Sequence, residues 1–367
     1  MKILHVINSM DMGGAQSLLV ELLPAQKRIG HDVSVLQLVD SSDRTLIKKL
    51  IEKDIKVMSL SKGRSVRNVI NIFALLSYFR EYDIIHAHLF PANYWVACAK
   101  LLSRNRTPIV TTEHSTDNKR RKIRMFRYID AFFYKRYQLV IACADIAMNS
   151  FVERYKGIQC ISIPNGVDIS QYICAIPYTK MELLGIPEDC FVLTMVARFI
   201  PSKRQDVVVK AISALPSKYH AVFVGGKRND KGLIEVLNLA QELGVSERVH
   251  FLYIRSDVPR ILKSSDIVIM SSEYEGLSLS SIEGMASGHP FVASDVKGLR
   301  EVVSGAGVLV KCGDSVALAE TIRKLCEDER YKDSVVSKCL KRSSQFDISN
   351  VAKNYIDVYR QIVEKYG

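Results

Sequence analysis

The sequence predicts an α/β protein with two doubly wound parallel sheets, each covered by helices on both faces. Three observations support this fold class. Runs rich in valine and isoleucine recur with little polar alternation, as in strands that are buried on both faces. Helical segments separate these runs, and alternating strands and helices imply right-handed crossovers within a parallel sheet. The length of 367 residues suits two domains of about 100–200 residues each.

The predicted elements follow in two series. The first series of strands covers Lys2–Ile7, Asp32–Leu38, Lys56–Leu60, Ile84–His88, Pro108–Thr112, Leu139–Ala142 and Cys160–Ile163. The second covers Phe191–Ala197, His220–Val224, Val249–Tyr253, Ile267–Met270, Phe291–Ala293 and Gly307–Val310. The predicted helices include Gly14–Ile29, Arg67–Phe79, Gln205–Ala214, Lys231–Leu243, Leu279–Ser287 and Val316–Glu327.

The two series are separated by a turn and an irregular stretch that contains Pro177 and Pro187. We therefore expect a first Rossmann-like domain at 1–170, a linker at 171–187 and a second Rossmann-like domain at 188–345. A terminal helix at 346–367 is expected to pack back on the first domain.

Composition and cysteine spacing argue against a membrane-spanning protein, a secreted protein and a cysteine-based metal site. No run reaches the roughly 18 apolar residues of a membrane helix, and the N-terminus reads as a strand and not as a signal peptide. The eight cysteines form no C-x-x-C pair and no metal-site spacing, which favours buried thiols in a reducing compartment. We therefore expect a cytoplasmic protein with no metal site and no cofactor.

The net charge of +12 is concentrated in the first half of the chain. Residues 1–170 contain 25 lysines and arginines against 15 aspartates and glutamates, and the stretch 119–136 has eight basic residues and one acid. Apolar residues alternate with these cations, as in a helix that lies on an anionic membrane. A solvated basic face on a core helix is the alternative. Nucleic acid is not expected, because no recognition module accompanies the charge.

Three motifs follow predicted strands. Gly13 and Gly14 stand at a strand-to-helix turn, where backbone N–H groups can approach a phosphate or a sugar, although such a turn is often only structural. Arg198 and Lys203 follow the first strand of the second domain and could neutralise a diphosphate.

The third motif is the block from Ser272 to Pro290. Glu275 and Glu283 are separated by seven residues, and the loop between them leads into a predicted helix. One carboxylate can accept hydrogen bonds from sugar hydroxyls and the other can hold a ribose diol, because both carboxylate oxygens are acceptors. A glycine-containing run then allows the helix to pack closely on the sheet.

This block resembles the Glu-x7-Glu signature of glycosyltransferase family 4. The resemblance extends in order along most of the chain. It includes Gly13-Gly14, Ile163-Pro-Asn-Gly-Val-Asp168, Arg198, Lys203, Val224-Gly-Gly226 and Arg300-Glu-Val-Val. It implies a retaining, metal-independent enzyme of the GT-B fold, with two Rossmann-like domains that face each other across a cleft and a nucleotide-sugar donor bound between them.

The resemblance also implies roles for single residues. Arg198 and Lys203 are expected to bind the donor diphosphate, Glu283 the ribose, and Glu275 and His114 the transferred sugar. The remaining expected donor contacts are Gly13, Gly14, Gly225, Gly226, Ile254, Gly276, Leu277 and Ser278. Ser278 and Arg204 stand where many family members have glycine, and the donor sugar is therefore left open.

Other residues have competing interpretations. His86 and His88 could ligate a metal, but the sequence shows no third ligand, so we expect one to line the acceptor site and the other to pack. Glu113 is a further candidate for contact with the acceptor.

The resemblance also implies a mechanism in which the acceptor hydroxyl attacks on the face from which the diphosphate departs, with the diphosphate taking the proton. The expected substrates are a UDP-sugar, with GDP as an alternative, and a glycan or a lipid-diphosphate-linked acceptor at the inner membrane surface. Three rivals remain: an NAD-dependent dehydrogenase, a sugar-nucleotide epimerase, and a catalytically silent sugar-nucleotide-binding partner. The dehydrogenase fingerprint is missing, and the Glu275–Glu283 block argues against an epimerase.

Overall fold

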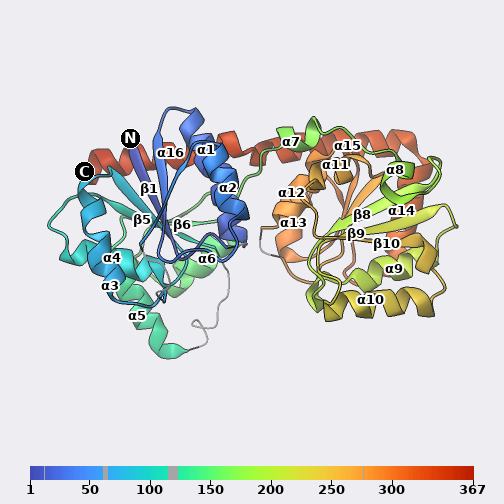
Figure 1. Ribbon diagram of the computed structural model, residues 1–367. Helices are drawn as coiled ribbons and strands as arrows, with labels where there is room; N and C mark the ends of the chain where they lie inside the picture. The colour runs from blue at the N-terminus through green and yellow to red at the C-terminus, as the bar shows by residue number, and fades with distance from the viewer. Residues whose placement is uncertain (12, 61–64, 115–122, 276) are drawn as a thin grey trace. The chain divides into compact units, whose positions relative to one another are not determined.

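The computed structural model describes residues 1–11, 13–60, 65–114, 123–275 and 277–367. The chain divides into two compact units (Figure 1). The first unit comprises Met1–Gly166 together with Ile348–Gly367, and the second comprises Val167–Asp347. Each unit contains one parallel sheet, as the alternation of strands and helices predicts.

The first unit contains a seven-stranded sheet in the order β3-β2-β1-β4-β5-β6-β7. Its strands are β1 (Lys2–Ile7), β2 (Asp32–Gln37), β3 (Lys56–Ser59), β4 (Ile84–His88), β5 (Ile109–Glu113), β6 (Leu139–Ala142) and β7 (Cys160–Ser162). Each corresponds to a predicted strand. Both faces are buried, because alternate residues such as Ile3 and Leu4 belong to two different core clusters.

Two groups of helices cover this sheet. The helices are α1 (Gly14–Arg28), α2 (Thr45–Glu52), α3 (Ile70–Leu75), α4 (Ala92–Leu102), α5 (Arg124–Tyr134), α6 (Asp145–Arg154) and α16 (Ile348–Tyr366). Helix α16 packs against α1, and its Tyr355 and Tyr359 are fully buried. The C-terminal end of the chain therefore completes the core of the first unit.

One predicted helix of the first unit is shorter than expected. The sequence predicts a helix over Arg67–Phe79, whereas the structure has α3 at Ile70–Leu75 and a separate 3-10 turn at Ser77–Arg80. The carboxamide of Asn68 accepts the backbone N–H of Ile70 at 3.0 Å. Asparagine competes for backbone groups in this way at turns, and the helix therefore begins later than its apolar pattern suggests.

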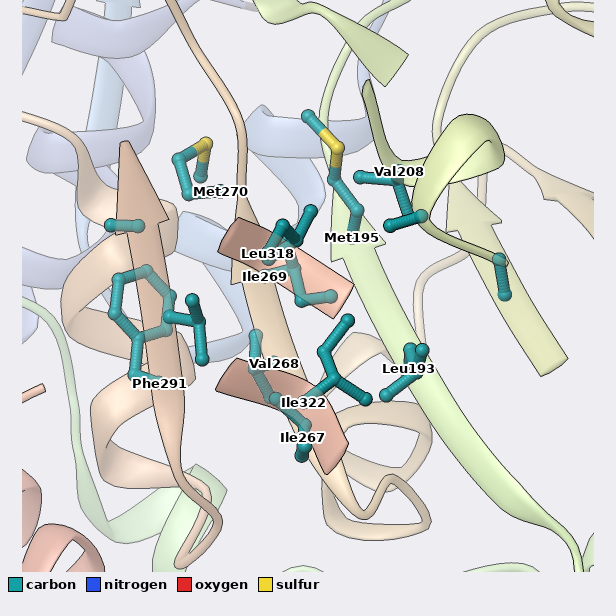
Figure 2. Packing of buried hydrophobic residues seen from close by; sticks show 14 of the residues in the cluster. Leu193, Met195, Val208, Ile267, Val268, Ile269, Met270, Phe291, Leu318 and Ile322 are labelled. Carbon is teal, nitrogen blue, oxygen red and sulfur yellow. The ribbon is translucent and has the colours of Figure 1, made fainter. Parts of the chain in front are cut away.

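The second unit contains a six-stranded parallel sheet in the order β10-β9-β8-β11-β12-β13. The strands are β8 (Phe191–Val196), β9 (Tyr219–Val224), β10 (Val249–Tyr253), β11 (Ile267–Met270), β12 (Phe291–Ser294) and β13 (Val308–Val310). Figure 2 shows part of the core, where Leu193, Ile269 and Phe291 from three neighbouring strands pack with Leu318 and Ile322.

The helices of the second unit flank this sheet on both faces. They are α7 (Ser170–Ile173), α8 (Lys180–Leu184), α9 (Gln205–Ser213), α10 (Lys231–Glu242), α11 (Val258–Lys263), α12 (Leu279–Ala286), α13 (Lys297–Val303), α14 (Ser315–Glu327) and α15 (Glu329–Ser343).

The stretch 171–187 differs from the expected linker. It belongs to the second unit and includes most of α7 and all of α8. Thr179 caps α8 in a reciprocal capping box with Glu182, and Leu183 and Leu184 pack against a buried cluster that includes Ile186 and Val192. The segment is therefore ordered by its own cap and by apolar contacts with the sheet.

No helix in the described part of the chain combines the length and the apolar character that crossing a bilayer requires.

Candidate active site

The second unit has a topological switch point at β8. Strand β8 pairs with β9 on one side and with β11 on the other, so the connections from these strands leave the sheet in opposite directions. In open α/β sheets, ligands bind outside the carboxyl ends of the strands at such a point. Most of the residues predicted for this unit follow one of these three strands.

Arg198 and Lys203 lie in the connection after β8. Arg198 is exposed, and its backbone carbonyl accepts hydrogen bonds from the side chain of Gln205 at 2.9 Å and from Ile200 N–H at 3.1 Å. Lys203 ends a 3-10 turn that begins at Pro201. The connection is thus shaped by backbone hydrogen bonds, which leave the Arg198 side chain available to a ligand.

Lys203 forms an ion pair with Glu275, which lies after β11. The two side chains are only 16% and 11% exposed, and the hydroxyl of Ser272 donates to the same carboxylate oxygen at 2.8 Å. The structure thus brings together a residue predicted to bind the diphosphate, Lys203, and a residue predicted to bind the sugar, Glu275. An ion pair with little exposure holds both side chains in place before any ligand arrives.

Further hydrogen bonds join the same two loops. The hydroxyl of Ser271 donates to the carbonyls of Lys203 at 2.9 Å and Arg204 at 2.8 Å. Glu273 N–H donates to the carbonyl of Ser202 at 2.8 Å. Arg204, at a φ of 52°, binds Asp206 and Glu273 through its guanidinium. Arg204 is therefore part of the internal structure of the site, which accounts for an arginine in a left-handed position.

Helix α12 follows the loop that contains Glu275. Gly276 lies outside the described residues, Leu277 is partly buried, and Ser278 is buried at the start of the helix. Glu283 lies in the second turn and is partly buried. A Cβ on Gly284 would come within 2.7 Å of the Phe291 ring, so a glycine is needed where α12 crosses the sheet.

Gly225 and Gly226 follow β9, and both have positive φ angles of 126° and 72°. A Cβ at Gly225 would lie 2.3 Å from the carbonyl oxygen of Ala197, and one at Gly226 would lie 2.6 Å from the ring of Phe199. Only glycine fits here. The β9 loop can therefore lie directly against the β8 loop, next to Arg198.

Ile254 follows β10, the outer neighbour of β9, and its side chain is 56% exposed. An exposed isoleucine beside the glycine loop offers an apolar surface to a flat ligand. The guanidinium of Arg228 lies over the ring of Tyr253, 5.2 Å from its centre. The loops after β9 and β10 therefore combine an apolar surface with positive charge.

The first unit has a corresponding switch point at β1, which pairs with β2 and β4. Gly13 precedes α1, whose first residue is Gly14. Gly14 has open space where a Cβ would stand. The backbone N–H groups at the start of a 15-residue helix form a site that attracts anions.

His114 follows β5 and is partly buried. Burial lowers its pKa to about 4, so the ring is neutral near pH 7. The neighbouring Glu113 is buried and accepts a hydrogen bond from the Tyr134 hydroxyl at 2.7 Å. The structure therefore gives Glu113 an internal partner.

The expectation that His86 or His88 lines an acceptor site is wrong, because both side chains are completely buried. His5 is the third histidine that the sequence reading missed, and ligand atoms of His5, His86 and His88 lie within 4.8 Å of one another. Their ring nitrogens already form hydrogen bonds, and the partners include Gln26, Thr112 and Tyr359. A metal ion would have to replace those bonds.

The register of the first sheet explains why these histidines meet. His5 of β1 is the direct partner of His86 in β4, and both point to the face covered by α1 and α16. The one signal in the sequence was a histidine in each of two apolar strands. Gln26 and Tyr359 come from helices, and no sequence pattern marked them.

The basic stretch 119–136 is described from Ile123 onward, and Lys119–Lys122 lie outside the described residues. Helix α5 covers most of the remainder, and its Asp130 is buried, where it accepts a hydrogen bond from Tyr155 at 2.9 Å. The opposite side of the helix is exposed. It presents Met125 and Tyr128, together with Phe132, at exposed fractions of 61%, 68% and 49%.

Family comparisons cover both units. Residues 12–171 match the family described as Glycosyltransferase Family 4. Residues 179–341 match the family described as Glycosyl transferases group 1.

Two curated relatives illustrate the similarity. The D-inositol 3-phosphate glycosyltransferase of Salinispora tropica is 26% identical over 321 residues, which span 78% of this chain and 65% of that protein, slightly less than two thirds of its length. The UDP-Gal:alpha-D-GlcNAc-diphosphoundecaprenol alpha-1,3-galactosyltransferase of Escherichia coli is 25% identical over 288 residues, or 74% of this chain and 73% of that protein.

A solved structure shows the same fold. The crystal structure of Anabaena Alr3699/HepE in complex with UDP superposes with a TM-score of 0.85 and 23% sequence identity. The superposition covers 98% of this chain and the whole of that one.

Proposed function

Because this chain belongs to glycosyltransferase family 4 and has the GT-B fold, we propose that it transfers a hexose-type sugar from a UDP-sugar to a glycan or a lipid-linked acceptor. The anomeric configuration of the sugar is retained. The observation that supports this most is the group of charged side chains at the β8 switch point, where Lys203 forms an ion pair with Glu275 in the connection that also contains Arg198.

In this proposal, Arg198 and Lys203 bind the donor diphosphate. The two cations neutralise the charge that develops on the departing diphosphate. The reaction then needs no metal and no cofactor. Lys203 exchanges its contact with Glu275 for a phosphate oxygen, and Glu275 becomes free to accept a hydroxyl of the transferred sugar.

Glu283 and the glycine loop complete the donor site. The carboxylate of Glu283 accepts both hydroxyls of the ribose, since a carboxylate offers an acceptor oxygen to each. Gly225 and Gly226 let the nucleotide approach the backbone, and Ile254 lies against the base. The amides at Leu277 and Ser278 face the sugar, whereas Gly276, also expected there, lies outside the described residues.

The first unit serves the acceptor and the transferred sugar. In this proposal the backbone N–H groups at the start of α1, beside Gly13 and Gly14, bind an anionic group of a substrate. His114 is neutral, so it contacts a sugar hydroxyl through a ring nitrogen and not as a cation. The acceptor hydroxyl attacks on the face that the diphosphate leaves, and the diphosphate takes its proton.

The substrate classes rest on two similar proteins. The name of the E. coli relative specifies a UDP-Gal donor and a diphosphoundecaprenol-linked acceptor, and the Anabaena structure contains UDP. A lipid-linked acceptor agrees with the exposed apolar and basic side of α5, which we propose lies on the anionic inner surface of the membrane.

The first test is thermal unfolding with a panel of nucleotides and nucleotide sugars in the presence of EDTA. A ligand at about 100 times its Kd stabilises the native state by about 2.7 kcal/mol. We expect a UDP-sugar to raise the unfolding temperature and Lys203→Ala or Glu283→Ala to abolish the shift. Lys338→Ala, an exposed lysine on α15, is the matched control and keeps the shift.

The second test is turnover. We expect sugar transfer or slow donor hydrolysis by the isolated protein, with kcat/KM lowered about 10²–10³-fold in Lys203→Ala. Tight donor binding without any turnover, with every candidate acceptor, would identify a silent sugar-nucleotide-binding protein instead. Stabilisation by NAD and not by any sugar nucleotide would exclude the proposal.

A further inference from the structure

A line of hydrogen-bonded side chains crosses the first unit and ends at His114. Gln26 of α1 contacts His5 of β1, with 3.0 Å between Oε1 and Nε2. Nδ1 of His5 lies 3.0 Å from Nε2 of His88 in β4. Nδ1 of His88 lies 3.2 Å from Nε2 of His114, which follows β5. Three histidines from adjacent strands are thus connected through both ring nitrogens of His5 and His88.

These rings are neutral near pH 7. Gln26, His5 and His88 are fully buried, and burial is the main cause of lowered pKa values along the line. The pKa falls to about 4 for His5 and for His114, and it falls well below its usual value for His88. A neutral imidazole has one N–H donor and one bare acceptor nitrogen, so the state of one nitrogen fixes the state of the other.

The carboxamide oxygen of Gln26 sets the direction of the line because it can only accept. His5 must then carry its proton on Nε2, which leaves Nδ1 bare. The bare Nδ1 of His5 accepts from Nε2–H of His88, and the bare Nδ1 of His88 accepts from Nε2–H of His114. The proton of His114 is therefore on Nε2, and its Nδ1 is a bare acceptor.

The orientation of the Gln26 amide is favoured by its other neighbour. The Gln26 carboxamide lies near the hydroxyl of Tyr359 from α16, but its Nε2 forms no hydrogen bond within the described residues. The Tyr359 hydroxyl lies 2.5 Å from Nδ1 of His86. When Tyr359 gives its one proton to His86, its lone pairs face Gln26. This arrangement favours the amide nitrogen toward Tyr359 and the amide oxygen toward His5.

We propose that Gln26 fixes the tautomer of His114 through His5 and His88, so that Nδ1 of His114 accepts a hydrogen bond from a hydroxyl of the bound sugar. Gln26, His5 and His88 are positioning residues in this proposal. If every hydrogen bond of the line ran in the opposite direction, Nδ1 of His114 would carry a proton. The sugar hydroxyl would then have no acceptor there. The sugar contact rests on the proposed function, whereas the tautomer assignment depends only on the first unit.

The test is long-range ¹H–¹⁵N correlation NMR of ¹⁵N-histidine-labelled protein at pH 7.5. This experiment distinguishes Nδ1–H from Nε2–H rings directly, and a His114→Gln variant assigns the signals of His114. We expect the Nε2–H pattern for His114, His88 and His5 in the wild-type protein. An Nδ1–H pattern for His114 would overturn the proposal whatever the activity of the protein is.

The companion variant is Gln26→Met, which keeps the length of the side chain and removes the acceptor. We expect the ¹⁵N shifts of His5, His88 and His114 to change together, while the hydrogen-bonded pair His220 and His250 in the second unit serves as the internal control. Unchanged ¹⁵N shifts of His88 and His114 would show that Gln26 does not control their tautomers through the hydrogen-bonded line. If the variant does not fold, the wild-type spectrum alone still decides the assignment.

Activity separates this inference from the proposed function. We expect kcat/KM for the UDP-sugar to fall about tenfold or more in Gln26→Met, as for other supporting hydrogen bonds, with thermal stabilisation by UDP alone retained. If the tautomer of His114 changes in Gln26→Met but the activity does not, then Nδ1 of His114 has no role in sugar binding. A wild-type protein that has the Nε2–H pattern but neither binds nor turns over any UDP-sugar would refute the proposed function and leave the tautomer assignment standing.

Discussion

Lys203 and Glu275 depend on each other, because each is largely withdrawn from water. The pair is 16% and 11% exposed and joins the loops after β8 and β11. When one partner is removed, the charge of the other stays partly buried and no longer has a charge of opposite sign beside it. Such a charge costs more than the intact pair contributes.

We predict that Lys203→Ala and Glu275→Ala each lower the free energy of unfolding of the second unit by about 1–3 kcal/mol. The double variant should lose less than the sum of the single losses, since it leaves no charge unpaired. Urea unfolding of the four proteins measures this coupling. Additive losses would show that the two side chains do not interact in solution.

Gly225 is restricted by both backbone conformation and space. Its φ is 126°, and an added Cβ would lie 2.3 Å from the backbone oxygen of Ala197. A backbone atom cannot move aside as the end of a side chain can. The β8 and β9 loops would have to separate.

We predict that Gly225→Ala lowers the free energy of unfolding of the second unit by about 1–3 kcal/mol and weakens UDP binding. Gly244→Ala is the matched control, since Gly244 also has a positive φ of 66° but nothing lies within 4 Å of its Cβ position. Equal effects of the two substitutions on UDP binding would show that the close approach of the loops is unimportant.

At the scale of elements, α5 has one side fixed to the first unit and one side open to solvent. Asp130 and Tyr134 are buried in the unit, and the ring of Phe133 stacks on Tyr94 with 4.0 Å between ring centres. The exposed side combines apolar side chains with Arg124, Arg127 and Arg136. This combination suits a helix that lies in the headgroup region of an anionic bilayer.

We predict that the protein floats with vesicles of anionic lipid at low salt, and that Met125→Glu with Phe132→Glu abolishes flotation. Both substitutions remove apolar contact and add repulsion from the lipid headgroups. Val316→Glu, at a residue of α14 that is 64% exposed, is the control and keeps wild-type binding. If the wild-type protein does not bind the vesicles at low salt, the exposed side of α5 is only a solvated basic face and not a membrane contact.

Element types were largely predictable, whereas element ends were not. The central strands are buried on both faces and are therefore largely apolar, and the edge strands keep enough valine and isoleucine to be recognised. Helix α8 was missed although Thr179 and Glu182 form a capping box that the sequence contains. Two nearby prolines obscured this signal, since they indicate irregular chain.

At the scale of the molecule, buried histidines link the stability of the first unit to pH. His5 and His114 have a pKa of 6.5 when unfolded and about 4 when folded. Between these values the unfolded chain binds protons that the folded chain does not. Their contribution to stability is therefore complete above pH 6.5 and is lost as the pH falls toward 4.

We predict that acidification from pH 7.5 to 5.5 lowers the free energy of unfolding of the first unit by about 1.3 kcal/mol for each of these histidines. His86 and His88, whose pKa values burial also lowers, add to this loss. Urea unfolding at both pH values measures it. An unchanged free energy would mean that the histidines are protonated in the folded state.

Local sequence patterns were sufficient to predict the order of strands and helices, the two parallel sheets, and the position of each motif at the carboxyl end of a strand. These features depend on local patterns, because burial of a strand and the geometry of a turn are written in adjacent residues. The sequence also predicted a terminal helix that packs back on the first domain, but not that Tyr359 of α16 would meet the buried His86, which is 273 positions away.

The contacts between residues far apart in the chain could not be predicted from such patterns. Lys203 and Glu275 are 72 positions apart, and His5 and His88 are 83 apart. Such contacts depend on the strand order and on the register between strands, which parallel crossovers set over long distances. The Gln26–His5–His88–His114 line exists because β1, β4 and β5 are neighbours in the sheet and because α1 covers the face on which these histidines lie.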